Sequence, residues 1–198
     1  MSLLSGELEH DPLTLFDSWL AQATESEPND PNAVALATCT PDGSPSVRMV
    51  LAKRVEEHRF AFFTNVESRK GTELETNLRA ALCFYWKSVR RQVRVEGGVH
   101  RLQPAQVDRY FHSRSRDSQI GAAISDQSRP LSNREELERR FAAMSEGLTG
   151  EVPRPEYWKG YYVEPVSVEF WMAGEHRLHD RALFTRANGQ WQSTLLFP

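Results

Sequence analysis

The sequence predicts a mainly β protein of the α+β class, an antiparallel barrel with peripheral helices. Strand-like segments come first, helices occupy the middle, and strand-like segments return at the end, with short turns between them. There is no regular strand–helix alternation, and no G-x-G-x-x-G or P-loop motif, which argues against a Rossmann fold. The 198 residues, 39% of them hydrophobic, suffice for one core. We therefore expect a single domain over residues 1–198, with an N-terminal helix and loop over residues 1–30.

The first half of the chain has the features of one helix followed by a β meander. Asp11 and Pro12 are typical of the N-cap and the first position of a helix. The apolar residues that follow at helical spacing are Leu13, Phe16, Trp19 and Leu20. Residues 24–32 are acidic and rich in Pro and Asn, which favours a loop. Strands are predicted over residues 33–39, 46–53 and 59–65, with turns at residues 41–43 and 56–57.

The second half carries the inserted helices and then more strands. Ser68 is placed to cap one helix, and Pro104 to begin the next. Ser132 with Glu135 three residues later forms the pattern of a capping box. The apolar face of the helix that follows comprises Leu137, Phe141 and Met144. Strands are predicted over residues 81–86, 90–102 and 157–172, with a bulge or bend at Gly97-Gly98 and a last hairpin at Asn188-Gly189.

Residues 168–181 combine a strand, a break and a dense polar cluster. The first part alternates with the period of a strand, and Ala173-Gly174 then interrupts it. Residues predicted to share one face of the following strand are Arg177, His179 and Arg181. Guanidinium groups hold anions in two-point contacts and imidazole exchanges protons near neutral pH, so this face suits an anionic planar ligand. The alternative is a solvated face with salt bridges to Glu175 and Asp180.

A second candidate site lies where a helix is predicted to begin. Residues 68–71 read Ser-Arg-Lys-Gly, so a hydroxyl, a guanidinium and an ammonium group adjoin free backbone N–H groups. That combination indicates a phosphate-binding site. The alternative is an ordinary N-cap followed by solvated charges.

Composition narrows the classes of function. The formal net charge of −3 argues against a general nucleic-acid binder, and no apolar run is long enough for a membrane span. The N-terminus lacks the pattern of a signal peptide, and Cys39 and Cys83 have no CxxC spacing, so a reduced, cytoplasmic protein is expected. The six histidines show no metal-ligand spacing, so we expect no metal site.

The segment Glu-Phe-Trp followed by Arg-Leu-His-Asp-Arg resembles the C-terminal signature of the pyridoxamine 5'-phosphate oxidase family. The resemblance extends from about Ala33 onward, with further motifs in the family's order. It implies the FMN-binding split barrel and an obligate homodimer in which each site is built from both chains. It also implies an FMN-dependent oxidase that converts pyridoxamine 5'-phosphate and pyridoxine 5'-phosphate to pyridoxal 5'-phosphate, with dioxygen as acceptor and hydrogen peroxide as product.

The resemblance assigns residues to each ligand. The implied FMN contacts are Arg48, Met49, Val50, Leu51, Lys53, Phe63, Thr64, Ser68, Arg69, Lys70, Gln92, Gln127, Ser128, Trp171 and Arg181. The implied substrate contacts are Lys53, Tyr110, Arg114, Ser118, Arg177 and His179. Arg177 and His179 would be the catalytic pair that orients the pyridine ring. Substrate and FMN each carry a phosphate, so each needs its own cluster of cations and hydroxyls.

The sequence departs from the family pattern at Lys159, Tyr162, Met172 and Leu195. These departures leave open a flavin oxidase of another small aromatic compound, as in the phenazine-pathway relatives. A second alternative is a non-catalytic FMN-binding protein. A third is nucleic-acid binding through Arg109, Arg114 and Arg116, which the net negative charge disfavours. The sequence does not rank the two phosphorylated substrates.

Overall fold

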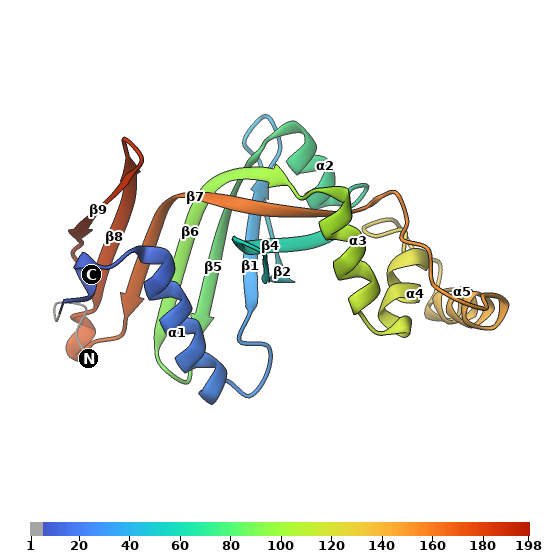
Figure 1. Cartoon of the computed structure of the whole chain (residues 1–198), viewed down its shortest axis with the longest axis horizontal. Coiled ribbons are helices and arrows are strands. Elements are labelled where there is room, and N and C mark those ends of the chain that lie inside the picture. The colour runs from blue at the N-terminus through green and yellow to red at the C-terminus, as the bar shows by residue number, and fades with distance from the viewer. Residues whose placement is uncertain (1–5) are drawn as a thin grey trace.

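The computed structural model describes residues 6–198, in which antiparallel strands form one sheet that curls into a half-barrel (Figure 1). Within the described residues the strand order is β2-β1-β5-β6-β7-β4-β3, with β8 beside β7 and β9 beside β8. The strands are β1 (Ala33–Cys39), β2 (Pro45–Leu51), β3 (Lys53–Val55), β4 (His58–Asn65), β5 (Arg79–Trp86), β6 (Arg91–Arg101), β7 (Trp158–Met172), β8 (Asp180–Ala187) and β9 (Gln190–Leu195). The predicted antiparallel sheet is confirmed, and β1 has the predicted bounds.

Strand β7 pairs with three other strands. It pairs with β6 from Tyr161 to Met172, with β4 near its start and with β8 near its end. The register with β6 shifts between Glu96 and Gly97, which confirms the predicted bulge. A Cβ on Gly97 would lie 2.0 Å from the carbonyl oxygen of Glu164, so only glycine fits this approach of two backbones.

The main core lies between α1 (Pro12–Ser26) and the concave face of the sheet. Asp11 caps α1 as predicted, accepting from the backbone N–H groups of Leu13 and Thr14. The ring of Phe16 lies 4.9 Å from Phe60 and 5.0 Å from Phe84, and that of Trp19 lies 5.0 Å from Phe170. Each buried aromatic of this kind stabilises the fold by roughly 2–3 kcal/mol. This packing fixes β4, β5 and β7 relative to one another.

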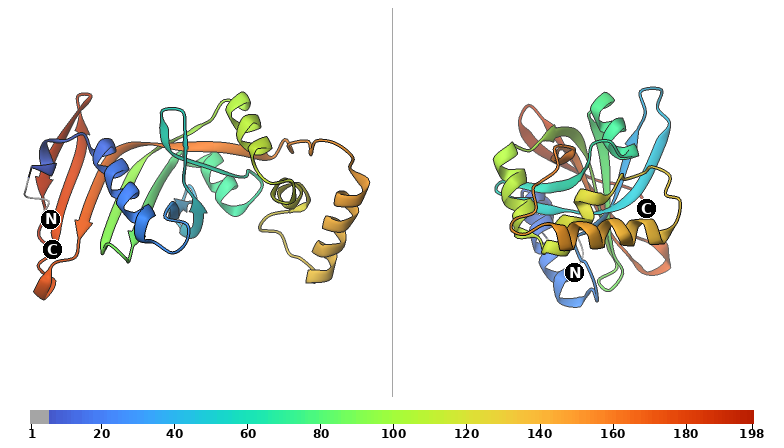
Figure 2. Two further views of the ribbon diagram at one scale, coloured as in Figure 1. Left: turned by 60° about the horizontal axis from the view of Figure 1, so that its bottom comes forward. Right: turned by 90° about the vertical axis from the view of Figure 1, so that its right-hand side faces the viewer.

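Helices α3 (Pro104–Ser113), α4 (Arg116–Ile124) and α5 (Arg134–Gly147) gather at the end of β7 that is far from β8 and β9 (Figure 2). Helix α2 (Arg69–Thr76) lies beside β1, and short 3-10 turns occur at Glu7–Glu9 and Glu175–Arg177. A second, smaller core joins α3 and α4 to the start of β7 through Phe111, Ile120 and Trp158. None of the described helices combines the length and the hydropathy that a bilayer span requires.

Some local predictions were wrong. Helix α5 is capped by Asn133, whose side chain accepts from the backbone N–H of Glu136, and not by Ser132. Helix α1 continues to Ser26, into the predicted loop. Arg177 and His179 do not lie on a strand, because a 3-10 turn occupies residues 175–177 and β8 begins only at Asp180. Part of the predicted N-terminal region, residues 1–5, lies outside the described residues.

Strand β2 is an edge strand with an exposed apolar face. Val47, Met49 and Leu51 alternate along it and are 68%, 63% and 43% exposed. An exposed apolar row on a sheet edge is a typical site of association with another chain.

Candidate functional site

A cavity of about 570 Å³ opens between β2, β4 and the helices α3 and α4. It brings together many residues that the resemblance assigned to ligands. These are Arg48, Met49, Val50, Leu51, Phe63, Thr64, Lys70, Tyr110, Arg114, Ser118 and Gln127. The cavity is also lined by residues that were not predicted, namely Asn65, Gly121, Ala122, Ser125 and Trp158.

Lys70 is the buried cation of this cavity, with 9% of its surface exposed. Its Nζ donates to Gln127 Oε1 at 2.8 Å, Thr64 Oγ1 at 3.1 Å and Ser68 Oγ at 3.3 Å. Among the described residues no carboxylate forms an ion pair with it. Burial, together with the nearby charge of Arg48, lowers the pKa of Lys70 to about 8. A buried cation without a counter-charge is costly, and it fits an anionic ligand that would supply one.

Lys70 lies in the first turn of α2. Ser68 caps the helix and accepts from the N–H of Gly71, which confirms the predicted N-cap. Ser128 Oγ accepts from the backbone N–H of Arg69 at 3.3 Å, so the segment after α4 closes over the helix N-terminus. The structure therefore brings Arg69, Lys70 and Ser128 together, as expected. The positive charges of Arg69 and Lys70 and the dipole of α2 both favour an anion at this helix N-terminus.

Glu73 is a residue that the sequence analysis missed. Only 3% exposed, its carboxylate accepts from Ser46 Oγ at 2.6 Å and from Arg69 Nε at 3.0 Å, and it also binds Thr38 and Arg48. Burial raises its pKa, but these hydrogen bonds and the charge of Arg48 outweigh burial and lower the pKa to about 2. Glu73 thus holds Arg48 and Arg69 in place. The one available signal was its position four residues after Arg69 on a helix.

An aromatic stack and a second cation form the opposite wall. The ring of Phe63 stacks on Tyr110 at 4.0 Å and on Trp158 at 5.1 Å. The guanidinium of Arg114 lies 5.3 Å from the Trp158 ring. Within residues 6–198, its buried Nη1 has no hydrogen-bond partner, and burial lowers the pKa of Arg114. A buried, unsatisfied guanidinium nitrogen is a second place suited to an anion.

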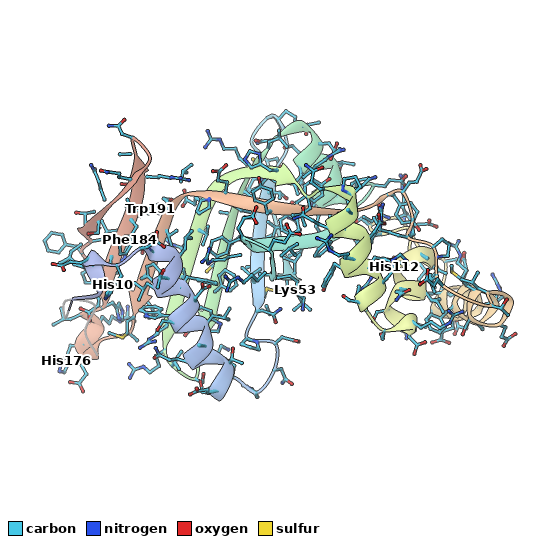
Figure 3. The ribbon with its side chains drawn as sticks, viewed as in Figure 1. His10, Lys53, His112, His176, Phe184 and Trp191 are labelled. Carbon is cyan, nitrogen blue, oxygen red and sulfur yellow. The ribbon has the colours of Figure 1, made fainter. Side chains whose placement is uncertain are left out.

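Lys53 is not brought into this cavity. The strand breaks at Ala52, and Lys53 lines a separate cavity of about 230 Å³ beside Asp17 and Arg59. Figure 3 shows Lys53 near the middle of the molecule, away from His112 on α3. The predicted cluster of Lys53 with Tyr110 and Arg114 is therefore not formed within one chain.

The other predicted residues gather at the far end of β7. Trp171 pairs with Gln92 on β6 and with Arg181 on β8, and its ring lies 4.7 Å from that of His179. Arg181 Nε donates to Glu169 at 2.9 Å, and its Nη1 donates to the carbonyl oxygen of Phe197 at 2.7 Å. We call Gln92, Trp171, Arg177, His179 and Arg181 the distal cluster. Of these, Arg177 is exposed, and its side chain has no hydrogen bond or ion pair among the described residues.

The distal cluster is far from the cavity within one chain. Trp158 of the cavity and Trp171 of the distal cluster are 13 residues apart on β7, a path of about 43 Å at roughly 3.3 Å per residue. Figure 1 shows the two ends of β7 on opposite sides of the molecule. One small ligand cannot contact both sets of residues in the same chain. No group of three or more potential metal ligands occurs among the described residues.

The chain is similar to known proteins along nearly its whole length. A family model described as pyridoxamine 5'-phosphate oxidase matches residues 20–146. A second, described as the pyridoxine 5'-phosphate oxidase C-terminal dimerisation region, matches residues 158–198. A pyridoxine/pyridoxamine 5'-phosphate oxidase of Gluconobacter oxydans is 53% identical over 97% of this chain and 96% of its own length. The enzyme of that name from Erythrobacter litoralis is 54% identical, over 96% and 92%.

Solved structures agree in fold. PhzG from Burkholderia lata, in complex with tetrahydrophenazine-1-carboxylic acid, has a TM-score of 0.88 at 34% identity, covering 95% of this chain and 93% of that one. A pyridoxamine 5'-phosphate oxidase-related, FMN-binding protein from Nostoc punctiforme has a TM-score of 0.79 at 18% identity, covering 96% and 100%. The fold is therefore the FMN-binding split barrel. With the family match over most of its length, the chain belongs to the pyridoxamine 5'-phosphate oxidase family.

Proposed function

We propose that this protein is an FMN-dependent oxidase that converts pyridoxine 5'-phosphate and pyridoxamine 5'-phosphate to pyridoxal 5'-phosphate, with dioxygen as acceptor and hydrogen peroxide as product. The observation that carries the proposal is that one cavity holds two cations, the buried Lys70 and the half-buried Arg114, for which no carboxylate partner occurs among the described residues. Cofactor and substrate each bring one phosphate, so each cation has a ligand to neutralise. Relatives that carry this activity in their names are more than half identical to the chain.

The residues around Lys70 would hold the FMN phosphate. Lys70, the N-terminus of α2 and the exposed hydroxyl of Ser128 would offer donors to a dianion, while the buried hydroxyl of Ser68 donates to the carbonyl oxygen of Asn65 and caps the helix. Arg69 has its Nε bound to Glu73, which leaves its outer nitrogens for the ligand. When bound, FMN supplies the two-electron redox chemistry, and the protein supplies binding, orientation and exclusion of water. Met49, Val50 and Leu51 of β2 would contact the flavin, as the resemblance implies.

The residues around Arg114 would hold the substrate phosphate. The Arg114 Nη1 is buried and has no hydrogen-bond partner among the described residues, and Tyr110 and Ser118 line the same cavity. The stacked rings of Phe63, Tyr110 and Trp158 keep this wall rigid and apolar. Such a wall would fix the position of the phosphate and leave the pyridine ring to be oriented by other residues.

Those other residues would come from a second copy of the chain. The distal cluster of one chain lies about 43 Å along β7 from its own cavity, so it can serve only a cavity in the partner. A homodimer would also cover the apolar row of β2, and residues 158–198 match a dimerisation region. In this arrangement Arg177 and His179 of the partner subunit would orient the substrate over the flavin, beside its Trp171 and Arg181.

The departures from the family pattern lie outside the cavity lining within the described chain. Tyr162 stacks on His100 at 5.2 Å. Met172 and Leu195 border the distal cluster, because Met172 pairs with Asp180 and Leu195 pairs with Ala182, on either side of Arg181. The phosphate-binding part of the proposed site is therefore unchanged, and the names of the relatives that are more than half identical favour the phosphorylated vitamers over a phenazine-type substrate.

An anaerobic titration tests the proposal. The protein loaded with FMN is mixed with each phosphorylated vitamer, and flavin absorbance is followed before and after air is admitted. We expect bleaching with both compounds, then recovery with release of peroxide. A flavin that binds but is bleached by neither compound would indicate a non-catalytic FMN-binding protein. Absence of FMN binding at saturating concentration would contradict the cofactor assignment as well.

A further inference from the structure

The segment between β7 and β8 is folded into a tight, strained turn. His176 and Arg177 both have left-handed backbone conformations, with φ of 52° and 64°. Residues with a side chain adopt this conformation rarely, and two in succession persist only where surrounding contacts enforce them. The contacts here are hydrogen bonds from the N–H of Leu178 to the carbonyl of Glu175 and from the N–H of His179 to that of Arg177. Figure 3 shows His176 at the edge of the molecule, opposite His112.

The turn brings Gly174 against the imidazole of His179. The backbone N–H of Gly174 donates to His179 Nδ1 at 3.2 Å. A Cβ at position 174 would lie 1.8 Å from the carbonyl oxygen of Leu178, so no other residue allows this approach. The Trp171 ring contacts the same imidazole from the side. The ring of His179 is therefore held by a backbone donor and an aromatic neighbour.

This contact determines which nitrogen of His179 carries the proton. A backbone N–H can only donate, so Nδ1 must accept with its lone pair and carries no hydrogen. In the neutral ring the hydrogen then lies on Nε2. We infer that Gly174 is a positioning residue, which fixes His179 as the Nε2–H tautomer and presents Nε2–H as a hydrogen-bond donor to an acceptor atom of the substrate. The substrate part of this inference rests on the proposed function.

His112 provides an internal comparison. Its Nδ1 lies 3.0 Å from the carbonyl oxygen of Asp108, which can only accept. Nδ1 of His112 must therefore carry the hydrogen, so the two histidines are expected in opposite tautomers.

Nitrogen NMR of the FMN-loaded protein tests the tautomer directly. The protein is labelled with ¹⁵N-histidine and measured at a pH where free histidine is neutral. Correlations between the ring nitrogens and the ring hydrogens then distinguish the nitrogen that carries a hydrogen from the nitrogen that does not. The His179→Gln and His112→Gln variants assign the two signals. We expect Nε2 to be protonated in His179 and Nδ1 in His112. A proton on Nδ1 of His179 would overturn the inference, whatever the protein oxidises.

A pair of substitutions tests the donor role. The amide nitrogen of Gln reaches the position of Nε2, whereas that of Asn reaches only the position of Nδ1. Both variants should reduce flavin more slowly than the wild type, but His179→Gln should exceed His179→Asn by roughly tenfold, the worth of one hydrogen bond. Equal rates in the two variants would refute the donor role. Failure of the wild type to reduce its flavin would instead refute the proposed oxidase, and the NMR result would still decide the tautomer.

Discussion

Replacing Lys70 with methionine should stabilise the empty protein and weaken the binding of FMN. The pKa of Lys70 falls from 10.5 to about 8 on folding. Each unit corresponds to about 1.4 kcal/mol, so holding the ammonium charged in the empty site costs roughly 3 kcal/mol. Methionine has a similar shape and no charge. The variant loses the three hydrogen bonds that Lys70 donates, but each acceptor keeps a partner: Thr64 and Gln127 stay bonded to each other at 3.1 Å, and Ser68 Oγ still accepts from the N–H of Gly71.

We therefore expect the free energy of unfolding of the flavin-free Lys70→Met variant to equal or exceed that of the wild type by roughly 1–3 kcal/mol at pH 7. FMN affinity should fall by roughly ten- to a hundred-fold, the worth of a charge-assisted hydrogen bond to phosphate. Urea unfolding at a fixed protein concentration and titration of flavin fluorescence give the two quantities. Arg134→Met, which removes an exposed charge from α5, is the matched control and should change neither.

The pH dependence has a defined sign. Since the folded pKa of Lys70 lies below the unfolded one, the unfolded chain binds more protons between pH 8 and 10.5. Stability of the flavin-free protein should rise with pH across that window, and Lys70→Met should remove this rise. FMN affinity should fall above about pH 8. A variant that loses stability by more than 1 kcal/mol and still binds FMN normally would show that Lys70 is structural, which would refute the reasoning.

The other predictions concern Glu73, the bulge at Gly97 and the edge strand β2. The pKa of Glu73 is lowered from 4.5 to about 2, so its stabilisation is complete above pH 4.5 and lost as pH falls toward 2. Glu73→Gln should therefore lower the free energy of unfolding by roughly 3 kcal/mol at pH 7, and it should reduce the fall of that free energy between pH 4.5 and pH 2, as measured by urea unfolding at a series of pH values. An unchanged fall over this pH range would exclude this role of Glu73. Gly97→Ala should lower the free energy of unfolding by roughly 3 kcal/mol. Gly98→Ala should lower it far less, because an added Cβ at Gly98 would lie 3.5 Å from its nearest neighbour atom, His100 Nε2. Equal losses of stability in thermal unfolding would contradict the bulge geometry. Val47→Asp, at a position of the exposed row that does not line the cavity, should leave the chain folded by circular dichroism but monomeric and flavin-free by light scattering and absorbance; a monomer that retains FMN would rule out a shared site.

Much of the fold could be predicted because local signals agreed with the tertiary structure. Asp11 and Ser68 cap helices as expected, and Gly97 marks the bulge because two backbones meet there. The predicted N-cap of α5 was wrong by one residue, because Ser132 and Asn133 are both good N-cap residues and only the path of the backbone selects between them.

The site could be predicted in part. The helix start at Ser68 and the charges beside it could be predicted because these residues are adjacent in sequence; the phosphate that they would bind stays a proposal. Arg177 and His179 were misplaced because alternating residue types do not show that two non-glycine residues adopt left-handed conformations. Glu73 was missed because a carboxylate four residues after an arginine usually lies in solvent, and only packing shows that it is buried. The separation of Lys53 from the cavity follows from the break at Ala52, which no motif marks.

The central claim is that each active site combines the cavity of one chain with the distal cluster of the other. The most direct measurement uses a purified heterodimer of differently tagged chains, one carrying Arg114→Ala and the other Arg177→Ala. If sites are shared, one site of this heterodimer carries both defects and the other carries none, so turnover should be about half that of the wild-type dimer. The two variant homodimers should be nearly inactive. A heterodimer as inactive as those homodimers would mean that each site is built from a single chain, and would contradict the claim.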